Sequence, residues 1–195
     1  MAIQKLNTIG ITKTKPGQGT YVINFNLEEY MGQVSELLWT PELIDHVLEF
    51  RRIIELTSLE LAVNRATKED LEKLNKLTKR HVELGKKIVK NENVLDNVLF
   101  EKYAGQDLKI HNLIVQMSYN PVIQSAYAIV KDTIYEYIKF ILSKKLSDKS
   151  YNLVVDNDPH RVIYNAILNN NYEEAKQAYI EMIDYNLENR DIIQE

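Results

Sequence analysis

An apolar stripe between residues 122 and 141 constrains the fold more than any other feature of the sequence. Steps of three and four residues place its side chains on one face of a helix, and that face must pack against another element. The stripe follows Asn120-Pro121, a pair that commonly starts a helix. Its members are Val122, Ala126, Ile129, Val130, Ile134, Tyr137, Ile138 and Ile141. The sequence therefore predicts a long amphipathic helix within a larger helical assembly.

Similar stripes cover the rest of the chain beyond residue 26. Thr40-Pro41 is a typical helix start, and Thr67 with Asp70 forms a capping box. The pattern predicts helices over residues 28–38, 40–65, 67–88, 94–103, 106–118, 120–141, 162–168 and 173–190. No segment after residue 25 alternates as a strand does. Short connections then favour an all-α fold, an antiparallel bundle of six or seven helices.

The first 25 residues show a different pattern. Residues 3–6 are typical of the end of a short helix that stops at Gly10. Two β-prone runs, residues 11–14 and 20–23, flank a Pro- and Gly-rich turn at residues 15–19, which predicts a β-hairpin. The segment carries lysines but no acidic residue, so a small basic part precedes an acidic helical body.

The composition excludes several classes of site. The chain has no cysteine, which rules out disulfides, thiolate zinc sites and cysteine nucleophiles. Its net charge of −4 argues against a nucleic-acid binder that acts through bulk charge. No apolar run is long enough to span a membrane and no signal peptide opens the chain, so we expect a cytoplasmic protein that does not bind membranes.

Asp107 and His111 are candidate metal ligands. They are four residues apart in a predicted helix, so both side chains lie on one face and can share a cation. His160 begins a later predicted helix and can approach them within a bundle. The alternative is an accidental surface pair without a ligand. His46 and His81 belong to no motif, and we interpret them as ordinary surface or core residues.

Several short motifs, taken in order, resemble one family of transcription regulators. Residues 2–11 and 15–22, which include Pro16-Gly17-Gln18-Gly19-Thr20, resemble the end of a winged helix-turn-helix of the GntR superfamily. The helical body from about Thr40 to Arg190 resembles the FCD-type effector-binding domain of its FadR subfamily. The motifs that carry this second resemblance are Glu49–Glu55, Arg65–Leu71, Asp107–His111, Met117–Pro121 and His160–Ile167.

The resemblance implies three parts and a function. Residues 1–25 would be the remnant of a DNA-binding domain truncated at its N-terminus, residues 26–39 a linker helix, and residues 40–195 the effector-binding domain. The chain would be the effector-binding and dimerisation part of a bacterial regulator, without catalytic activity. The intact protein would bind operator DNA as a homodimer, whereas this chain would not. The implied DNA-binding residues of the remnant wing are Lys13, Lys15, Gly17 and Gly19.

The resemblance also implies the ligands of the helical body. The effector would be a small organic acid whose carboxylate is bound by Arg51 and Asn120. For Arg51, an ion pair with Glu49 or Glu55 is the alternative. A divalent metal ion, zinc or nickel, would be held by Asp107, His111 and His160. The family places a fourth ligand, a histidine, where this chain has Met182, and a thioether is a poor ligand for such ions.

Two other functions stay open at this point. Two histidines and one carboxylate also occur in metal-dependent helical-bundle enzymes, although the sequence offers no additional general base. A helical interaction module without a small ligand is the second alternative. Such a module would have a solid apolar core, whereas a sensor would have a polar site around the three candidate ligands.

Overall fold

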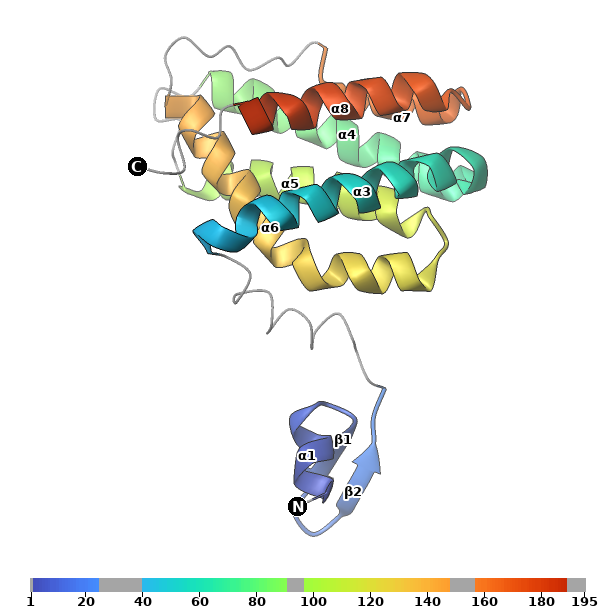
Figure 1. Ribbon diagram of the computed structural model, residues 1–195, viewed down its shortest axis with the longest axis vertical. Helices are drawn as coiled ribbons and strands as arrows, with labels where there is room; N and C mark the ends of the chain where they lie inside the picture. The colour runs from blue at the N-terminus through green and yellow to red at the C-terminus, as the bar shows by residue number, and fades with distance from the viewer. Residues whose placement is uncertain (1, 25–39, 91–96, 148–156, 189–195) are drawn as a thin grey trace.

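The computed structural model describes residues 2–24, 40–90, 97–147 and 157–188 (Figure 1). A short helix and a β-hairpin near the N-terminus precede a bundle of long helices. The predicted all-α bundle with an N-terminal hairpin is therefore confirmed. The helix predicted over residues 28–38 lies outside the described residues. Among the helices of the described ranges, none has the length and apolar character that crossing a membrane requires.

The N-terminal segment folds as the sequence predicts. After α1 (Ala2–Thr8), β1 (Thr12–Lys15) pairs antiparallel with β2 (Gly19–Val22). Gly17 and Gly19 adopt φ angles of 75° and 96° at the tip. Residues with a side chain rarely adopt these angles, so the two glycines make the tight turn possible.

Asn7 connects the short helix to the hairpin. Its amide nitrogen donates a hydrogen bond to Thr14 Oγ1 over 2.7 Å, and its Oδ1 accepts one from Thr12 Oγ1 over 2.6 Å. Lys13 and Lys15 are exposed on β1. Helix and hairpin thus form one small unit with two lysines at its surface.

The predicted capping box starts the second helix of the bundle. α3 (Pro41–Arg65) ends two residues before Thr67, and α4 (Lys68–Val89) begins directly after Thr67. Thr67 Oγ1 accepts from the Asp70 amide over 3.1 Å, while the Asp70 carboxylate accepts from the Thr67 amide over 2.9 Å. The short turn reverses the direction of the chain between α3 and α4.

The third bundle helix corrects one prediction. Residues 94–103 and 106–118 were expected to form two helices, but α5 (Asn97–Gln116) runs without interruption through Gly105. A glycine inside a helix costs only about 1 kcal/mol relative to alanine. Tyr103, Ala104 and Ile110 are buried around Gly105, and their packing outweighs that cost.

The remaining helices complete the bundle. α6 (Pro121–Ser147) begins at the predicted proline, and α7 (Pro159–Leu168) is joined to α8 (Tyr172–Glu188) by a turn of asparagines. One apolar cluster lies among α3, α4, α5, α7 and α8, and another among α3, α5 and α6. Because α4 packs on α5 and α7, polar residues of these three helices can meet beside the apolar core (Figure 1).

Candidate metal centre

The three predicted metal ligands lie together. Asp107 and His111 come from α5, and His160 comes from the first turn of α7. His160 Nε2 lies 3.3 Å from Asp107 Oδ1, and His111 Nε2 lies 3.6 Å from Asp107 Oδ2. Both imidazoles are buried, and the Asp107 side chain is 15% exposed. The sequence interpretation of these residues as one cluster matches this arrangement.

His81, which the sequence led us to interpret as an ordinary surface or core residue, is a core residue that lies against these ligands. It lies on α4, and its Nε2 is 3.9 Å from Asp107 Oδ1. Its ring stacks on Tyr103 with centroids 4.3 Å apart and meets the His160 ring edge-on at 4.5 Å. The sequence did contain a signal: His81 occupies the buried stripe of α4, where an imidazole needs polar partners.

A carboxylate binds the Nδ1 atom of each imidazole. Asp158, the N-cap of α7, accepts from His81 Nδ1 over 2.7 Å and from His160 Nδ1 over 3.0 Å. Glu55 of α3 accepts from His111 Nδ1 over 2.6 Å. An ionised carboxylate only accepts, so each Nδ1 carries a proton, and Nε2 keeps its lone pair whenever the imidazole is neutral. Histidines that ligate metals are commonly oriented in this way.

Two of these Nε2 atoms have no hydrogen-bond partner. His81 Nε2 and His160 Nε2 are buried and unbonded among the described residues, although both face Asp107. Leaving a buried polar atom without a partner costs about 1–3 kcal/mol. A divalent cation beside Asp107 would satisfy both atoms. Three imidazole nitrogens and one carboxylate are a donor set that suits zinc or nickel.

The charges of the cluster also fit a divalent cation. Three carboxylates, Glu55, Asp107 and Asp158, accompany one guanidinium, Arg51, among the side chains that these contacts join. These four groups carry a net charge of −2 when the imidazoles are neutral, and Lys145 of α6 also interacts with Asp107. Buried charge without compensation is costly, and a divalent cation carries the opposite charge of the same size.

The charges within the cluster also shift the pKa values of its carboxyl and imidazole groups. Burial would raise the pKa of Asp107 and of Asp158, but the imidazoles beside them outweigh burial and hold both pKa values well below the usual range. Burial would lower the pKa of His160, but Asp158 and Asp107 raise it to about 10. His81 differs, because burial and the His160 charge lower its pKa. In the protein alone, a proton on His160 therefore supplies part of the missing positive charge.

Arg51 is paired inside the bundle. Its Nε donates to Glu55 Oε1 over 2.9 Å, and its side chain is 4% exposed. Burial would raise the pKa of Glu55, but Arg51 and His111 lower it to about 2. The ion pair with Glu55, one alternative for this residue, is thus what the structure contains. The predicted effector contact of Arg51 stays a prediction.

Two other predicted residues have structural roles. Asn120 caps α6, since its Oδ1 accepts from the Val122 amide over 3.0 Å. Met182, where the family resemblance implies a fourth ligand, lies on α8 and packs against the apolar cluster among α3, α4, α5, α7 and α8. The fourth nitrogen or oxygen ligand of the cluster therefore does not come from Met182.

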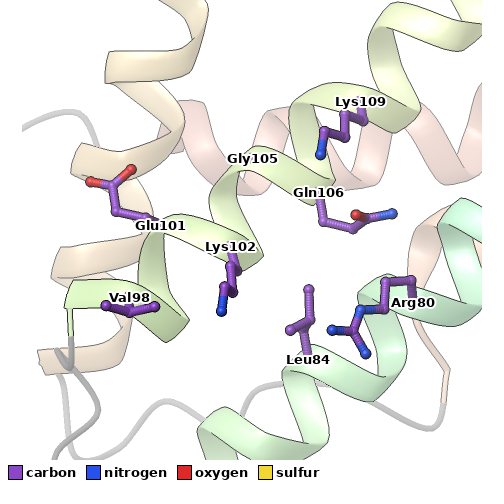
Figure 2. Close-up of a pocket in the computed structure, with 8 residues that line it drawn as sticks. All are labelled: Arg80, Leu84, Val98, Glu101, Lys102, Gly105, Gln106 and Lys109. Atoms are coloured by element: carbon purple, nitrogen blue, oxygen red, sulfur yellow. The ribbon is translucent and has the colours of Figure 1, made fainter.

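A surface groove between α4 and α5 is separate from these residues (Figure 2). Its volume is about 670 Å³. None of the predicted ligands lines it. The lining residues are Arg80, Leu84, Val98, Glu101, Lys102, Gly105, Gln106 and Lys109.

Comparisons with known proteins agree on one family. The model of the FCD domain matches residues 46–185. The HTH-type transcriptional regulator LutR of Bacillus subtilis (strain 168) is 27% identical over 186 residues, which cover 92% of this chain and 77% of that protein.

Two solved structures share the fold. Streptococcus agalactiae GntR has a TM-score of 0.64 and 23% identity, over 93% of this chain and 76% of its own. E. coli McbR/YncC has a TM-score of 0.57 and 13% identity, over 95% of this chain and 79% of its own.

Proposed function

The chain belongs to the FCD domain family, and we propose that its helical body senses a small organic acid at a divalent metal ion. The proteins that it matches are GntR-type transcription regulators, which are not enzymes. Regulators of this family bind small-molecule effectors and DNA. The proposal adds the chemistry of the effector and the metal. It assigns Asp107, His111 and His160 as metal ligands.

The observation that carries the proposal is the set of unbonded imidazole nitrogens beside Asp107. His81 Nε2 and His160 Nε2 are buried without a hydrogen bond, and every Nδ1 of the cluster is bonded to a carboxylate. A bundle that served only as an interaction module would bury apolar residues at this place. The buried polar cluster supports a ligand site instead.

The charges support an anionic effector. When bound, zinc or nickel supplies a positive charge and an accessible coordination position for a carboxylate oxygen. Arg51 of α3 would add a guanidinium to the same site, and Glu55 holds that guanidinium in place. An organic acid is the simplest molecule that satisfies both groups.

The signal would reach DNA through the packing of helices. The cluster joins α3, α4, α5 and α7, so an effector bound there favours one arrangement of these helices over another. In a homodimer this changes the spacing of two DNA-binding parts. Lys13 and Lys15 of the hairpin would then contact DNA phosphates.

Thermal unfolding with and without Zn²⁺ tests the proposal. A panel of short mono- and dicarboxylic acids is added to the full chain at saturating Zn²⁺ and, in parallel, after chelation. We expect at least one acid to raise the unfolding temperature only when Zn²⁺ is present, and His111→Gln to abolish that effect. An equal shift without Zn²⁺ would contradict the role of the metal. Light scattering that shows only monomer would contradict the homodimer.

A further inference from the structure

We infer that His81 of α4 is a metal ligand, so that the centre has three imidazoles and one carboxylate drawn from α4, α5 and α7. The inference rests on the proposed metal site and extends it to a residue outside the motifs that predicted that site. Its basis is the position, burial and bonding of the His81 ring.

The His81 ring is directed at Asp107. Its Nε2 lies 3.9 Å from Asp107 Oδ1, the same oxygen that His160 Nε2 approaches to 3.3 Å. Both imidazole nitrogens thus approach one oxygen of Asp107. Two tetrahedral ligand atoms about 2.0–2.2 Å from a zinc ion lie about 3.3–3.6 Å apart, so the His160–Asp107 distance already suits a shared ion and the His81–Asp107 distance exceeds it by only a few tenths of an ångström.

Two contacts fix the orientation of the ring. His81 Nδ1 is bonded to Asp158 Oδ2 over 2.7 Å, and Tyr103 stacks on the ring face at 4.3 Å. Rotating the ring to turn Nε2 away from Asp107 would break both contacts. The bundle therefore holds the lone pair of His81 Nε2 in the direction that a ligand requires.

A purely structural role does not account for Nε2. A core histidine is normally satisfied at both nitrogens, yet His81 Nε2 is buried without a partner. The opposite side of the ring is not the metal side, because Nδ1 already makes a bond of ordinary hydrogen-bond length to Asp158. A cation at Nε2 would give that atom a partner while Nδ1 keeps its hydrogen bond to Asp158.

Zinc affinity of single histidine variants tests the inference. The full chain is titrated with Zn²⁺ against a chromophoric chelator, and folding of each variant is checked by circular dichroism. We expect His111→Gln and His81→Gln each to weaken binding by at least about 100-fold, the upper end of what losing an outer partner costs. His46→Gln is the matched control, because His46 is the exposed histidine of α3 and should bind like the wild type.

The outcomes separate this inference from the proposed function. If the wild type fails to bind Zn²⁺, the metal part of the proposed function is wrong and the inference falls with it. If His111→Gln loses Zn²⁺ while folded His81→Gln retains wild-type affinity, the proposed function stands and the inference is wrong.

A second measurement does not depend on variants. Long-range ¹H–¹⁵N spectra of the wild-type imidazoles are recorded during a Zn²⁺ titration. We expect His81, His111 and His160 to show the Nε2 shift of a coordinated nitrogen with the proton on Nδ1, while His46 stays unchanged. An unshifted His81 Nε2 at saturating Zn²⁺ would overturn the inference even if His81→Gln proved unstable.

Discussion

Asp158 orients two of the three imidazoles at once. It accepts from both His81 Nδ1 and His160 Nδ1, and it also caps α7. We expect Asp158→Asn to weaken zinc binding by about 10–100-fold, because the amide keeps a capping oxygen but loses the charge that makes the imidazoles better ligands. Competition with a chromophoric chelator measures the change.

A charge-matched control is available on α6. Asp132 is exposed, so Asp132→Asn changes the net charge by the same amount without touching the cluster and should bind zinc like the wild type. If Asp158→Asn bound zinc as tightly as Asp132→Asn, the imidazoles would not depend on Asp158.

The residues of the site differ in how far the sequence could predict them. Asp107 and His111 are four apart, a local spacing that places them on one helix face whatever the tertiary fold. The contacts of Asp158 with His81 and of Glu55 with His111 were not predicted, because they join residues separated by 77 and 56 positions. Only the packing of α3, α4 and α7 around α5 brings them together.

At the scale of single helices, the clearest wrong prediction is the helix break at Gly105. Gly105 lies inside α5, and a Cβ added there would meet only the Tyr135 hydroxyl at 3.9 Å, an ordinary contact. Gly105→Ala should therefore stabilise the protein by about 0.5–1 kcal/mol, because alanine loses less backbone entropy in a helix. Urea unfolding measures the difference.

A lower stability of Gly105→Ala would mean that the backbone of α5 bends or is approached closely at this position. The break was expected at residues 104–105 because glycine often ends a helix. The buried neighbours Tyr103 and Ala104 decide otherwise, and their burial depends on contacts that no local pattern contains.

The capping box of α4 predicts a pH dependence. Burial would raise the pKa of Asp70, but hydrogen bonds from Tyr119 and Thr67 lower it. A carboxyl group with a depressed folded-state pKa contributes stability above its unfolded pKa of about 3.9, and this contribution is lost as pH falls through the folded pKa. Asp70→Asn should thus cost about 0.3–1 kcal/mol at pH 7 and progressively less below pH 4.

Urea unfolding at pH 7 and pH 3 measures this effect. Glu69→Gln is the control, because Glu69 lies in the same helical turn and forms an exposed ion pair with Lys73 outside the capping box. A constant gap between wild type and Asp70→Asn at both pH values would show that the charge of Asp70 does not support the cap.

At the scale of the whole molecule, periodicity predicted the bundle but not its internal arrangement. Stripes at helical spacing state that each helix has a buried face. They do not state which faces meet, because apolar contacts are not directional. The placement of α4 against α5 and α7, which brings His81 to Asp107, follows from the summed packing of all helices and was not predictable from any one of them.

This arrangement makes metal binding a property of the whole bundle. The proposed ligands come from α4, α5 and α7, and their carboxylate partners from α3 and the cap of α7, so unfolding would separate the groups that are proposed to hold the ion. A ligand that binds only the folded state stabilises it by about 2.7 kcal/mol at 100 times its Kd. We therefore expect Zn²⁺ to raise the unfolding temperature by several degrees and a chelator to reverse the rise. His46→Gln should retain the effect, and His111→Gln should lose it. An equal rise in both variants would place the ion outside this cluster, because a surface site does not require α4, α5 and α7 to remain together.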